Sequence, residues 1–588
     1  MAFQGGGTGY DISKAKPVSP EDFNKYKTIF NRLGMSDIPE KLLHRIVIPI
    51  FNRRFNKSGE ASNAGDDGTT SPNTMDDMMK SHVDLDSCVE RAGEGPFSPG
   101  KHEKDEQCKY EVNGYVKPGF ERVRDAFARN FALGKERDAQ LAIYHHGELI
   151  VDLYGSNKEP NQSAPLTNGY DANTLQIVFS STKMMAATVF AVAVDKGWLK
   201  YNDNVSKHWP EFAQNGKEHI TIADVLRHDA GLNSFDSTIS HVDHMDHENR
   251  NGNNAKIIAK QKMWKWTVGK DKGKTPRIYH AMSRGFILNQ ILMRAHPDGK
   301  TISQVLSEEV TSKLQADFYF GQYPKGWRSR HHRAFMESPT NSWMLPNFMM
   351  KQVVSEIMPE QFLRDDPNAL ELALFQRSKE GRVIFKHSPA KFNTGAPQSF
   401  GDRSLDLEWN EPGYTKKMTR TKKINGFNDM LMLMQSPHAT DMESPSSNGY
   451  ANAKGMARVM AMLSMKGTLN NVRILSEGTV AQFCDKPVDG LDRCNGLKDW
   501  MAQSVFVQGG AQASHLTQAA TLGKVVGKES FGWGGLGGSA LWFNPVDEIG
   551  FGYAVTGATF GLAGDPGRLG PIYDALNDCF GFYSKSKL

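Results

Sequence analysis

The fold is decided by one stretch of the chain, residues 175–187, which read LQIVFSSTKMMAA. An apolar, strand-like run ends at Ser180, and a helix that is apolar nearly all round follows and is predicted to stop at Gly197. Residues three apart on a helix lie about 60° apart around its axis and about 4.5 Å along it. The Lys183 amine is therefore expected beside the Ser180 hydroxyl, at the buried first turn of this helix.

A serine beside a buried lysine suggests nucleophilic chemistry. A serine hydroxyl is a weak nucleophile at neutral pH, and an apolar environment can lower the pKa of a lysine enough for it to act as the base. Backbone N–H groups at the start of the helix can stabilise a developing oxyanion. The S-x-x-K spacing alone is common, and usually marks a capping Ser and a surface Lys. Because this helix is apolar, we predict instead that Ser180 is the nucleophile and Lys183 its base.

Two further blocks follow the helix. Residues 198–212 read WLKYNDNVSKHWPEF, and residues 220–232 read ITIADVLRHDAGL. With the S-x-x-K helix, they resemble the class C β-lactamase and family VIII carboxylesterase group of the serine β-lactamase and penicillin-binding-protein superfamily. That group has a G-x-L-x-L-x-D-x-V turn, a P-E-F stretch and an I-T-I-x-x-L-L-x-H-x-x-G-L block after the helix. The resemblance covers about residues 114–583, with interruptions, and implies an α+β fold: an antiparallel sheet flanked by helices plus a mostly helical subdomain.

The resemblance assigns the group's second motif, Y-x-N, to Tyr279-His280-Ala281. It implies that the Tyr279 phenol, held near Lys183, carries the proton from Ser180 to the leaving group. Ala281 stands where the group has an Asn that helps to hold the amide of a β-lactam. This departure weakens the expectation of β-lactamase activity.

The third motif, K-T-G or H-x-G at the start of an edge strand, is represented by Trp533-Gly534-Gly535. Several family VIII esterases have a similar W-x-G. By resemblance, the N–H groups of Leu536 and Ser180 form the oxyanion hole, Trp533 supplies an apolar wall, and the glycines let the strand approach the acyl group closely. The cation that would anchor the acidic group of a β-lactam or a C-terminal peptide is missing. Ester substrates do not require it.

Local patterns predict the other elements of the domain. The expected elements are a helix over 120–131, a hairpin over 141–154, a helix over 284–292, a second hairpin over 539–555 and a last helix over 571–580. His228 is expected to be structural, and the loop around Asn448 structural or in contact with substrate. The histidines of residues 241–247 are expected in a solvated loop rather than at a metal.

The chain is predicted to divide into four parts. They are an N-terminal extension (1–55) with an amphipathic helix near 38–48, a disordered linker (56–112) rich in Ser, Gly, Asn, Asp and Lys, a hydrolase domain (113–583) with a polar insertion at about 325–425, and a C-terminal tail (584–588). The helix in the extension packs against the main domain or binds a surface or partner, and we favour the first.

Composition excludes several classes of protein. The 588 residues are 39% hydrophobic and 23% charged, with a net charge of +4, which is typical of a globular protein. No aromatic-interleaved basic stripe suggests a nucleic-acid partner. Five scattered cysteines without a CxxC pair argue against a disulfide framework or a structural zinc. No apolar run is long enough to span a membrane, and neither a metal nor an organic cofactor is implied.

The N-terminus lacks the pattern of a secretory signal, so we expect synthesis in the cytosol. The last residues, Ser586-Lys587-Leu588, match a peroxisomal address that an import receptor reads. We therefore expect this receptor as a partner and the peroxisome as the location, with the cytoplasm as the alternative.

These patterns predict a serine hydrolase that cleaves a small-molecule ester, or a related acyl compound, through an acyl-enzyme on Ser180. One alternative is a catalytically weak or inactive scaffold, because some eukaryotic β-lactamase domain-containing relatives look like assembly-forming scaffolds. The departures from the motifs at Ala281 and Trp533 are compatible with this alternative. Another is a β-lactamase or D-amino-acid peptidase, which the missing carboxylate anchor disfavours. A homo-oligomer is compatible with each of these.

Overall fold

The computed structural model describes the greater part of the predicted hydrolase domain. The described residues are 110–157, 169–232, 235, 249–263, 277, 279–336, 376–377, 383–384, 407–411, 414–418, 435, 440, 443–491, 503–516, 526–558 and 566–582. They all belong to the second of two compact units, Asp105–Ser338 with Met358–Leu588. The predicted extension, almost all of the predicted linker, residues 241–247 and the C-terminal tail lie outside the described residues.

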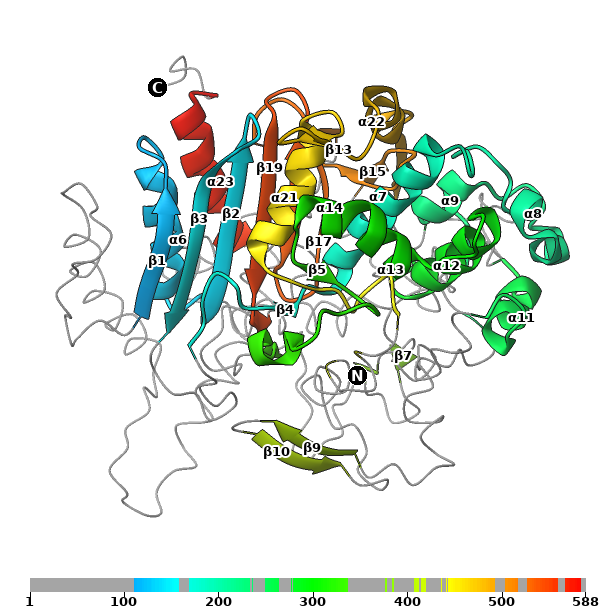
Figure 1. Ribbon diagram of the computed structural model, residues 1–588, viewed down its shortest axis with the longest axis horizontal. Helices are drawn as coiled ribbons and strands as arrows, with labels where there is room; N and C mark the ends of the chain where they lie inside the picture. Colours follow the sequence, from blue (N-terminus) through cyan, green and yellow to red (C-terminus); the bar gives the residue numbers. More distant parts are fainter. Residues whose placement is uncertain are drawn as a thin grey trace, which may run out of the picture. The chain divides into compact units, whose positions relative to one another are not determined.

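A nine-stranded antiparallel sheet is the framework of this unit (Figure 1). Its strands, in spatial order, are β1 (Tyr110–Val116), β3 (Glu148–Asn157), β2 (Asp138–His145), β19 (Ile549–Val555), β18 (Ala540–Asn544), β17 (Phe531–Gly534), β16 (Gln512–Ala513), β15 (Gln503–Phe506) and β14 (Val488–Leu491). The two predicted hairpins, β2–β3 and β18–β19, lie side by side, since β2 pairs with β19. The antiparallel sheet expected from the sequence is confirmed.

Strand β1 extends the sheet beyond the predicted start of the domain. It begins at Tyr110, three residues inside the predicted linker, which therefore ends earlier than expected. Most of its side chains are exposed, and only Tyr110, Val112 and Val116 are partly buried. A strand that buries so little has no strong apolar pattern, so its sequence is typical of a linker.

Helices cover both faces of the sheet (Figure 1). On one face, α6 (Glu121–Ala132) and α23 (Pro566–Phe580) share an apolar core with the sheet, in which Phe127 and Ile572 are completely buried. On the other face, α21 (Ala453–Ser464) packs against β2, β18 and β19. Helix α23 begins five residues before the predicted start at 571.

A mostly helical part adjoins the face that carries α21 (Figure 1). It contains α7 (Thr182–Asp195), α8 (Val205–His208), α9 (Ile222–Leu226), α11 (Asn253–Lys260), α12 (Ser283–Ala295), α13 (Ile302–Val305), α14 (Ser312–Leu314) and α22 (Glu477–Cys484). Helix α7 is buried from Thr182 to Ala193 and packs against α12, α13 and α22. Gly197, at a φ of 73°, follows the end of α7, as the sequence predicts.

Short strands pair outside the large sheet. They are β4 (Gln176–Ile177), β11 (Tyr450–Ala451) and β5 (Phe318–Tyr319) in one sheet, β6 (Phe335–Met336) with β20 (Gly557–Ala558), and the pairs β7 (Gln376–Arg377) with β8 (Val383–Ile384), β9 (Leu407–Glu411) with β10 (Tyr414–Met418), and β12 (Thr468–Leu469) with β13 (Val472–Arg473). Of these, β6 to β10 lie within the predicted insertion at about 325–425. Trp327 and Ala334 are buried, so the first residues assigned to the insertion pack within the domain.

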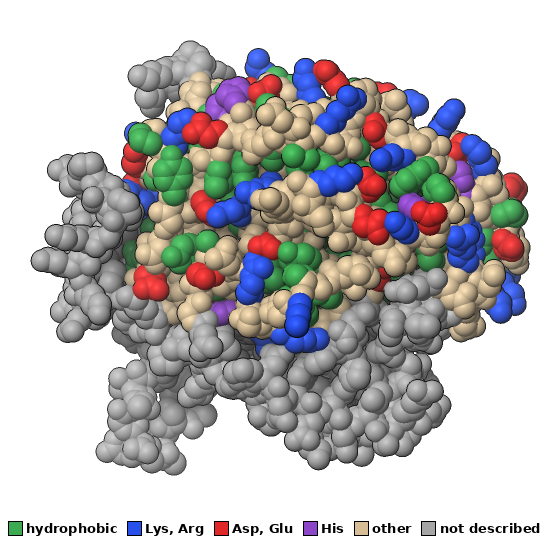
Figure 2. All heavy atoms as spheres, viewed as in Figure 1, with side chains coloured by type: hydrophobic (Ala, Val, Ile, Leu, Met, Phe, Trp, Pro, Cys, Tyr) green, Lys and Arg blue, Asp and Glu red, His purple; other side chains and the backbone are tan. Residues whose placement is uncertain are grey.

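The described surface carries charges of both signs. In the view of Figure 2, lysine and arginine side chains are interspersed with acidic ones, and apolar side chains appear between them. In the part of the chain that the structure describes, no helix combines the length and the apolar character needed to cross a membrane.

Candidate active site

Ser180 lies in a tight turn between a strand and a helix. Strand β4 ends at Ile177, a single 3-10 turn spans Phe179–Ser181, and α7 begins at the next residue. Phe179 has a φ of 45°, in the left-handed region that a bulky side chain rarely adopts. Such a conformation persists where the surroundings fix it, and it is common at functional sites. Here the Phe179 carbonyl accepts a hydrogen bond from Thr182 Oγ1 at 2.5 Å.

The Lys183 ammonium group is held beside Ser180. Its side chain is completely buried, and Nζ donates hydrogen bonds to Ser180 Oγ (3.2 Å), the Ala281 carbonyl (2.6 Å) and the Ser446 carbonyl (2.9 Å). These three contacts fix the position of the nitrogen: an ammonium group donates in all three, whereas a neutral amine donates to the two carbonyls and has a lone pair for the Ser180 proton. The juxtaposition predicted from the helical spacing is therefore present.

Tyr279 completes a triangle with these two groups. Its hydroxyl lies 2.7 Å from Ser180 Oγ, and its ring centroid lies 4.9 Å from Lys183 Nζ. Either oxygen of a hydroxyl pair can carry the shared proton, so the same contact can run from Ser180 to Tyr279 when the phenol is ionised. The three residues named from the sequence thus come together, although Tyr279 is 99 residues from Ser180 in the chain.

The second motif acts through its backbone. The Ala281 side chain has no amide. Its backbone carbonyl accepts the shortest of the three hydrogen bonds given above for Lys183 Nζ. The His280 N–H donates to Nδ1 of His228 at 2.9 Å, and Nε2 of His280 accepts the Leu232 N–H at 3.0 Å. Both histidines are completely buried, so the motif is fixed to the segment that follows α9. This supports the structural role expected for His228.

The third motif lies on β17 and in the turn after it. Trp533 is 6% exposed, and its ring stacks on Tyr279 with centroids 6.0 Å apart and planes at 19°. Gly534 is the last residue of β17. At Gly535 a Cβ atom would lie 2.3 Å from the Val178 carbonyl oxygen, so only glycine allows the turn to approach the Ser180 segment this closely.

Leu536 is the predicted second donor of the oxyanion hole. In the described part of the chain, its backbone N–H donates no hydrogen bond to another protein group. It lies in the turn directly after Gly535 and is partly exposed. A free N–H at this position is available to an oxyanion.

Two buried side chains around Trp533 did not enter the predicted site. The Arg284 guanidinium lies 5.5 Å from the Trp533 ring centroid, and the His228 ring lies 5.3 Å from it. Burial holds the pKa of His228 well below its ordinary value, and the positive charge of Arg284 lowers it further. Arg284 opens the apolar helix α12, just as Lys183 opens α7. This shared signal, a cation in the first turn of an apolar helix, identifies Lys183 from sequence and could have identified Arg284.

The loop before α21 contacts both Lys183 and α12. Ser446 Oγ accepts the Gly285 N–H at 2.8 Å, while the Ser446 carbonyl accepts Lys183. Asn448 Oδ1 accepts the Ser444 N–H at 3.1 Å within the loop, as expected for a structural asparagine. Among the described residues, no group of three His, Cys, Asp or Glu side chains could hold a metal ion.

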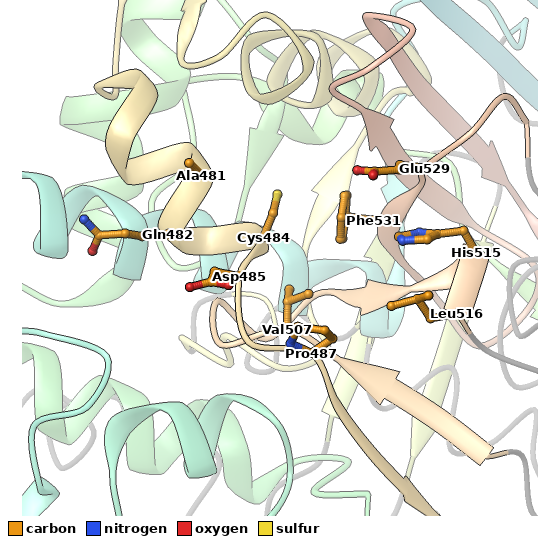
Figure 3. A pocket seen from close by; sticks show the side chains of 10 residues that line it. All are labelled: Ala481, Gln482, Cys484, Asp485, Pro487, Val507, His515, Leu516, Glu529 and Phe531. Atoms are coloured by element: carbon orange, nitrogen blue, oxygen red, sulfur yellow. The ribbon is translucent and has the colours of Figure 1, made fainter.

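A separate hollow of about 490 Å³, open to solvent, lies near the start of β17 (Figure 3). Its lining residues are Ala481, Gln482, Cys484, Asp485, Pro487, Val507, His515, Leu516, Glu529 and Phe531. Burial raises the pKa of the Cys484 thiol, so this thiol is not activated as a nucleophile. Ser180, Lys183 and Tyr279 are not among these residues, so the hollow is separate from the triangle predicted to be catalytic.

This chain is similar in sequence to known proteins. The Beta-lactamase family model matches residues 124–568. Esterase/beta-lactamase LipL of Mycobacterium tuberculosis is 25% identical over 446 residues, which cover 75% of this chain and 82% of the relative.

Solved structures show the same fold. A family VIII carboxylesterase superposes with a TM-score of 0.56 at 25% identity, covering 80% of this chain and all of that one (100%). EstA from Arthrobacter nitroguajacolicus gives 0.55 at 23%, with 80% and 99% of the chains covered. A penicillin-binding protein homologue from Caulobacter crescentus gives 0.54 at 22%, with 80% and 100% covered. These two likenesses concern the fold alone.

Proposed function

Since the chain belongs to the Beta-lactamase family and is a hydrolase, we propose that it cleaves carboxylic esters, or closely related acyl compounds, through an acyl-enzyme on Ser180. The observation that carries the proposal is the triangle at the start of α7. Ser180 Oγ lies 3.2 Å from Lys183 Nζ and 2.7 Å from the Tyr279 hydroxyl. A hydroxyl between an amine and a phenol has both a base to take its proton and a route for returning it.

In the proposed acylation step, Ser180 Oγ attacks the carbonyl carbon of the ester, and its proton passes to Tyr279 or Lys183. The carbonyl oxygen becomes an oxyanion, which the N–H groups of Ser180 and Leu536 stabilise. The intermediate then expels the alcohol, which takes up the proton, and the acyl group stays on Ser180. A water molecule repeats the sequence and releases the carboxylic acid and free Ser180.

The third motif supports an ester rather than a β-lactam or a C-terminal peptide. The Trp533 ring, stacked on Tyr279, occupies the position where the resemblance leads one to expect a cation for the substrate carboxylate. Ala281 has no side-chain amide to hold the amide of a lactam. The relatives agree in part, because one is described as an esterase/beta-lactamase and one as a family VIII carboxylesterase.

Short p-nitrophenyl esters and a fluorophosphonate probe test the proposal. We expect turnover and labelling by the wild-type protein and neither by Ser180→Ala. Ser181→Ala is the matched control, because the Ser181 hydroxyl faces Ser539 Oγ at 3.1 Å and should not be needed. No turnover or labelling in any of the three would favour the scaffold alternative, and hydrolysis of nitrocefin at a comparable rate would favour the β-lactamase alternative.

We also propose that Ser586-Lys587-Leu588 is read by a peroxisomal import receptor. These residues lie outside the described residues, and the proposal is supported by the match of the tripeptide alone. A fluorescent protein fused to the N-terminus should enter peroxisomes with the full chain and stay in the cytoplasm when the three residues are deleted. Lys585→Ala is the control that should leave the location unchanged, and a location unaffected by the deletion would rule the proposal out.

A further inference from the structure

Arg284 is a buried cation without an acidic partner. Its side chain is 1% exposed, and among the described residues no carboxylate forms an ion pair with it. Its Nη1 lies 3.4 Å from the carbonyl of Lys183, whereas Nε and Nη2 have no hydrogen-bond partner. Burying a charge without compensation destabilises a fold, so such a group calls for a functional explanation.

The structure keeps room for this guanidinium beside the active site. Gly510 has a φ of 85°, and a Cβ atom there would lie 2.7 Å from Arg284 Nη2. The face of Trp533 lies 5.5 Å from the guanidinium, a cation–π contact, and the same indole stacks on Tyr279. Arg284 thus lies against the indole that stacks on the Tyr279 ring.

The charges around Tyr279 are mainly positive. Lys183, from α7, lies 4.9 Å from the Tyr279 ring centroid, and Arg284 lies on α12. His228, which follows α9 and lies 4.9 Å from the ring, is held neutral by burial. Asp229, its neighbour in the chain, is already bound by Arg277 through two hydrogen bonds of 2.7 and 2.8 Å.

Burial lowers the pKa of Arg284 to about 9, while the charge of an ionised Tyr279 raises it. The guanidinium is therefore protonated at neutral pH, and its interaction with an ionised Tyr279 is attractive. The attraction between two charges is mutual. A cation that is stabilised by the phenolate stabilises the phenolate to the same extent.

We propose that Arg284 is a positioning residue that stabilises the phenolate form of Tyr279, so that Tyr279 accepts the Ser180 proton during acylation and returns it to the leaving alcohol. This proposal rests on the proposed function. In this chain Trp533 holds the strand position where a cation is expected. The second cation near Tyr279, beside Lys183, is Arg284 from α12 instead. Because Arg284 is buried, it acts on Tyr279 without offering a contact to substrate.

The test is the pH profile of kcat/KM for a p-nitrophenyl ester. Arg284→Met removes the charge and leaves an apolar side chain of similar length, which a buried site tolerates. We expect its acidic limb to move to higher pH by about one unit, the lower end of the effect of a nearby opposite charge. Arg284→Lys should keep the wild-type limb. Arg294→Met is the matched control, since Arg294 lies on the same helix with its guanidinium 4.3 Å from the Trp209 ring centroid.

A second measurement does not depend on the folding of these variants. The difference in near-ultraviolet tyrosinate absorbance between the wild type and Tyr279→Phe gives the pH at which Tyr279 ionises. A free tyrosine has a pKa of about 10, and we expect Tyr279 to ionise at a pH well below that value. Ionisation at or above that pH would overturn the proposal, as would an Arg284→Met profile that is lower at every pH but unshifted. If the wild type hydrolyses no ester, the proposed function fails, and the same titration repeated in Arg284→Met still decides whether Arg284 and Tyr279 are coupled.

Discussion

Gly535→Ala tests whether the turn after β17 and the turn that carries Ser180 form one unit. An added Cβ would lie 2.3 Å from the Val178 carbonyl oxygen and 2.2 Å from Ser539 Oγ. The Ser539 side chain can rotate away, but the Val178 carbonyl belongs to the backbone. Since non-bonded heavy atoms pack at about 3.5–4.0 Å, the two segments have to separate by about 1 Å.

The separation should affect both stability and rate. The Val178 carbonyl accepts the Ser181 N–H (3.1 Å) and Ser539 Oγ (2.8 Å), so moving it disturbs the turn around Ser180. Overpacking of this kind costs about 1–3 kcal/mol of unfolding free energy. It also draws the Leu536 N–H away from the Ser180 N–H, and loss of one oxyanion donor lowers kcat by roughly 10²–10³-fold.

Urea unfolding and ester hydrolysis measure the two effects. Gly570→Ala is the control, because Gly570 lies in α23 with nothing within 4 Å of an added Cβ. Alanine there should leave the rate unchanged and raise the unfolding free energy by up to about 1 kcal/mol. A Gly535→Ala protein as stable and as active as the wild type would refute the close approach on which the oxyanion site depends.

Three further predictions follow from buried side chains. Lys183→Met should lower kcat/KM for an ester by about 10²–10⁴-fold and reduce the unfolding free energy by about 1–3 kcal/mol, because the carbonyls that Lys183 contacts lose their donor; fluorophosphonate labelling at the wild-type rate would contradict the role of the amine. Burial lowers the pKa of His331 from 6.5 to about 3. Below pH 6.5 the unfolded chain therefore binds a proton at this histidine that the folded chain does not bind. The contribution of His331 to the unfolding free energy is complete above pH 6.5 and is lost as the pH falls toward 3. Urea unfolding across this range should show a shallower decline for His331→Gln, and an unchanged slope would refute the assignment. Trp533→Lys places a second cation beside Arg284, so it should lower the unfolding free energy less in an Arg284→Met background than in the wild type. A double-mutant cycle should give a coupling energy of about 0.5–3 kcal/mol. Additive losses would show that the two positions do not interact.

The Ser180–Lys183 pair could be predicted because helix geometry fixes it locally. A helix that is apolar all round has to be buried, and the 3-10 turn that carries Ser180 leads directly into α7, so a lysine three residues after the serine lies beside it. The hairpins β2–β3 and β18–β19 were predictable for a similar reason, since strand alternation and a turn define each of them. These elements also confirm the fold class expected from the sequence.

Other parts of the site depend on contacts between distant segments. Tyr279 comes from another part of the chain, and only the resemblance to a family identified it. The acceptors of Lys183 are the carbonyls of Ala281 and Ser446, and every residue type has a carbonyl, so sequence carries no signal for them. The catalytic roles of these residues, and of Leu536, stay predictions.

Trapping the acyl-enzyme tests the proposed role of Ser180 most directly. The protein is mixed with a p-nitrophenyl ester, quenched in acid within the first turnover and digested, and the peptides are weighed by mass spectrometry. We expect a mass increase equal to the acyl group on the peptide that carries Ser180, and no such increase in Ser180→Ala. Hydrolysis that continues in Ser180→Ala, or an acyl group found on a different residue, would contradict it.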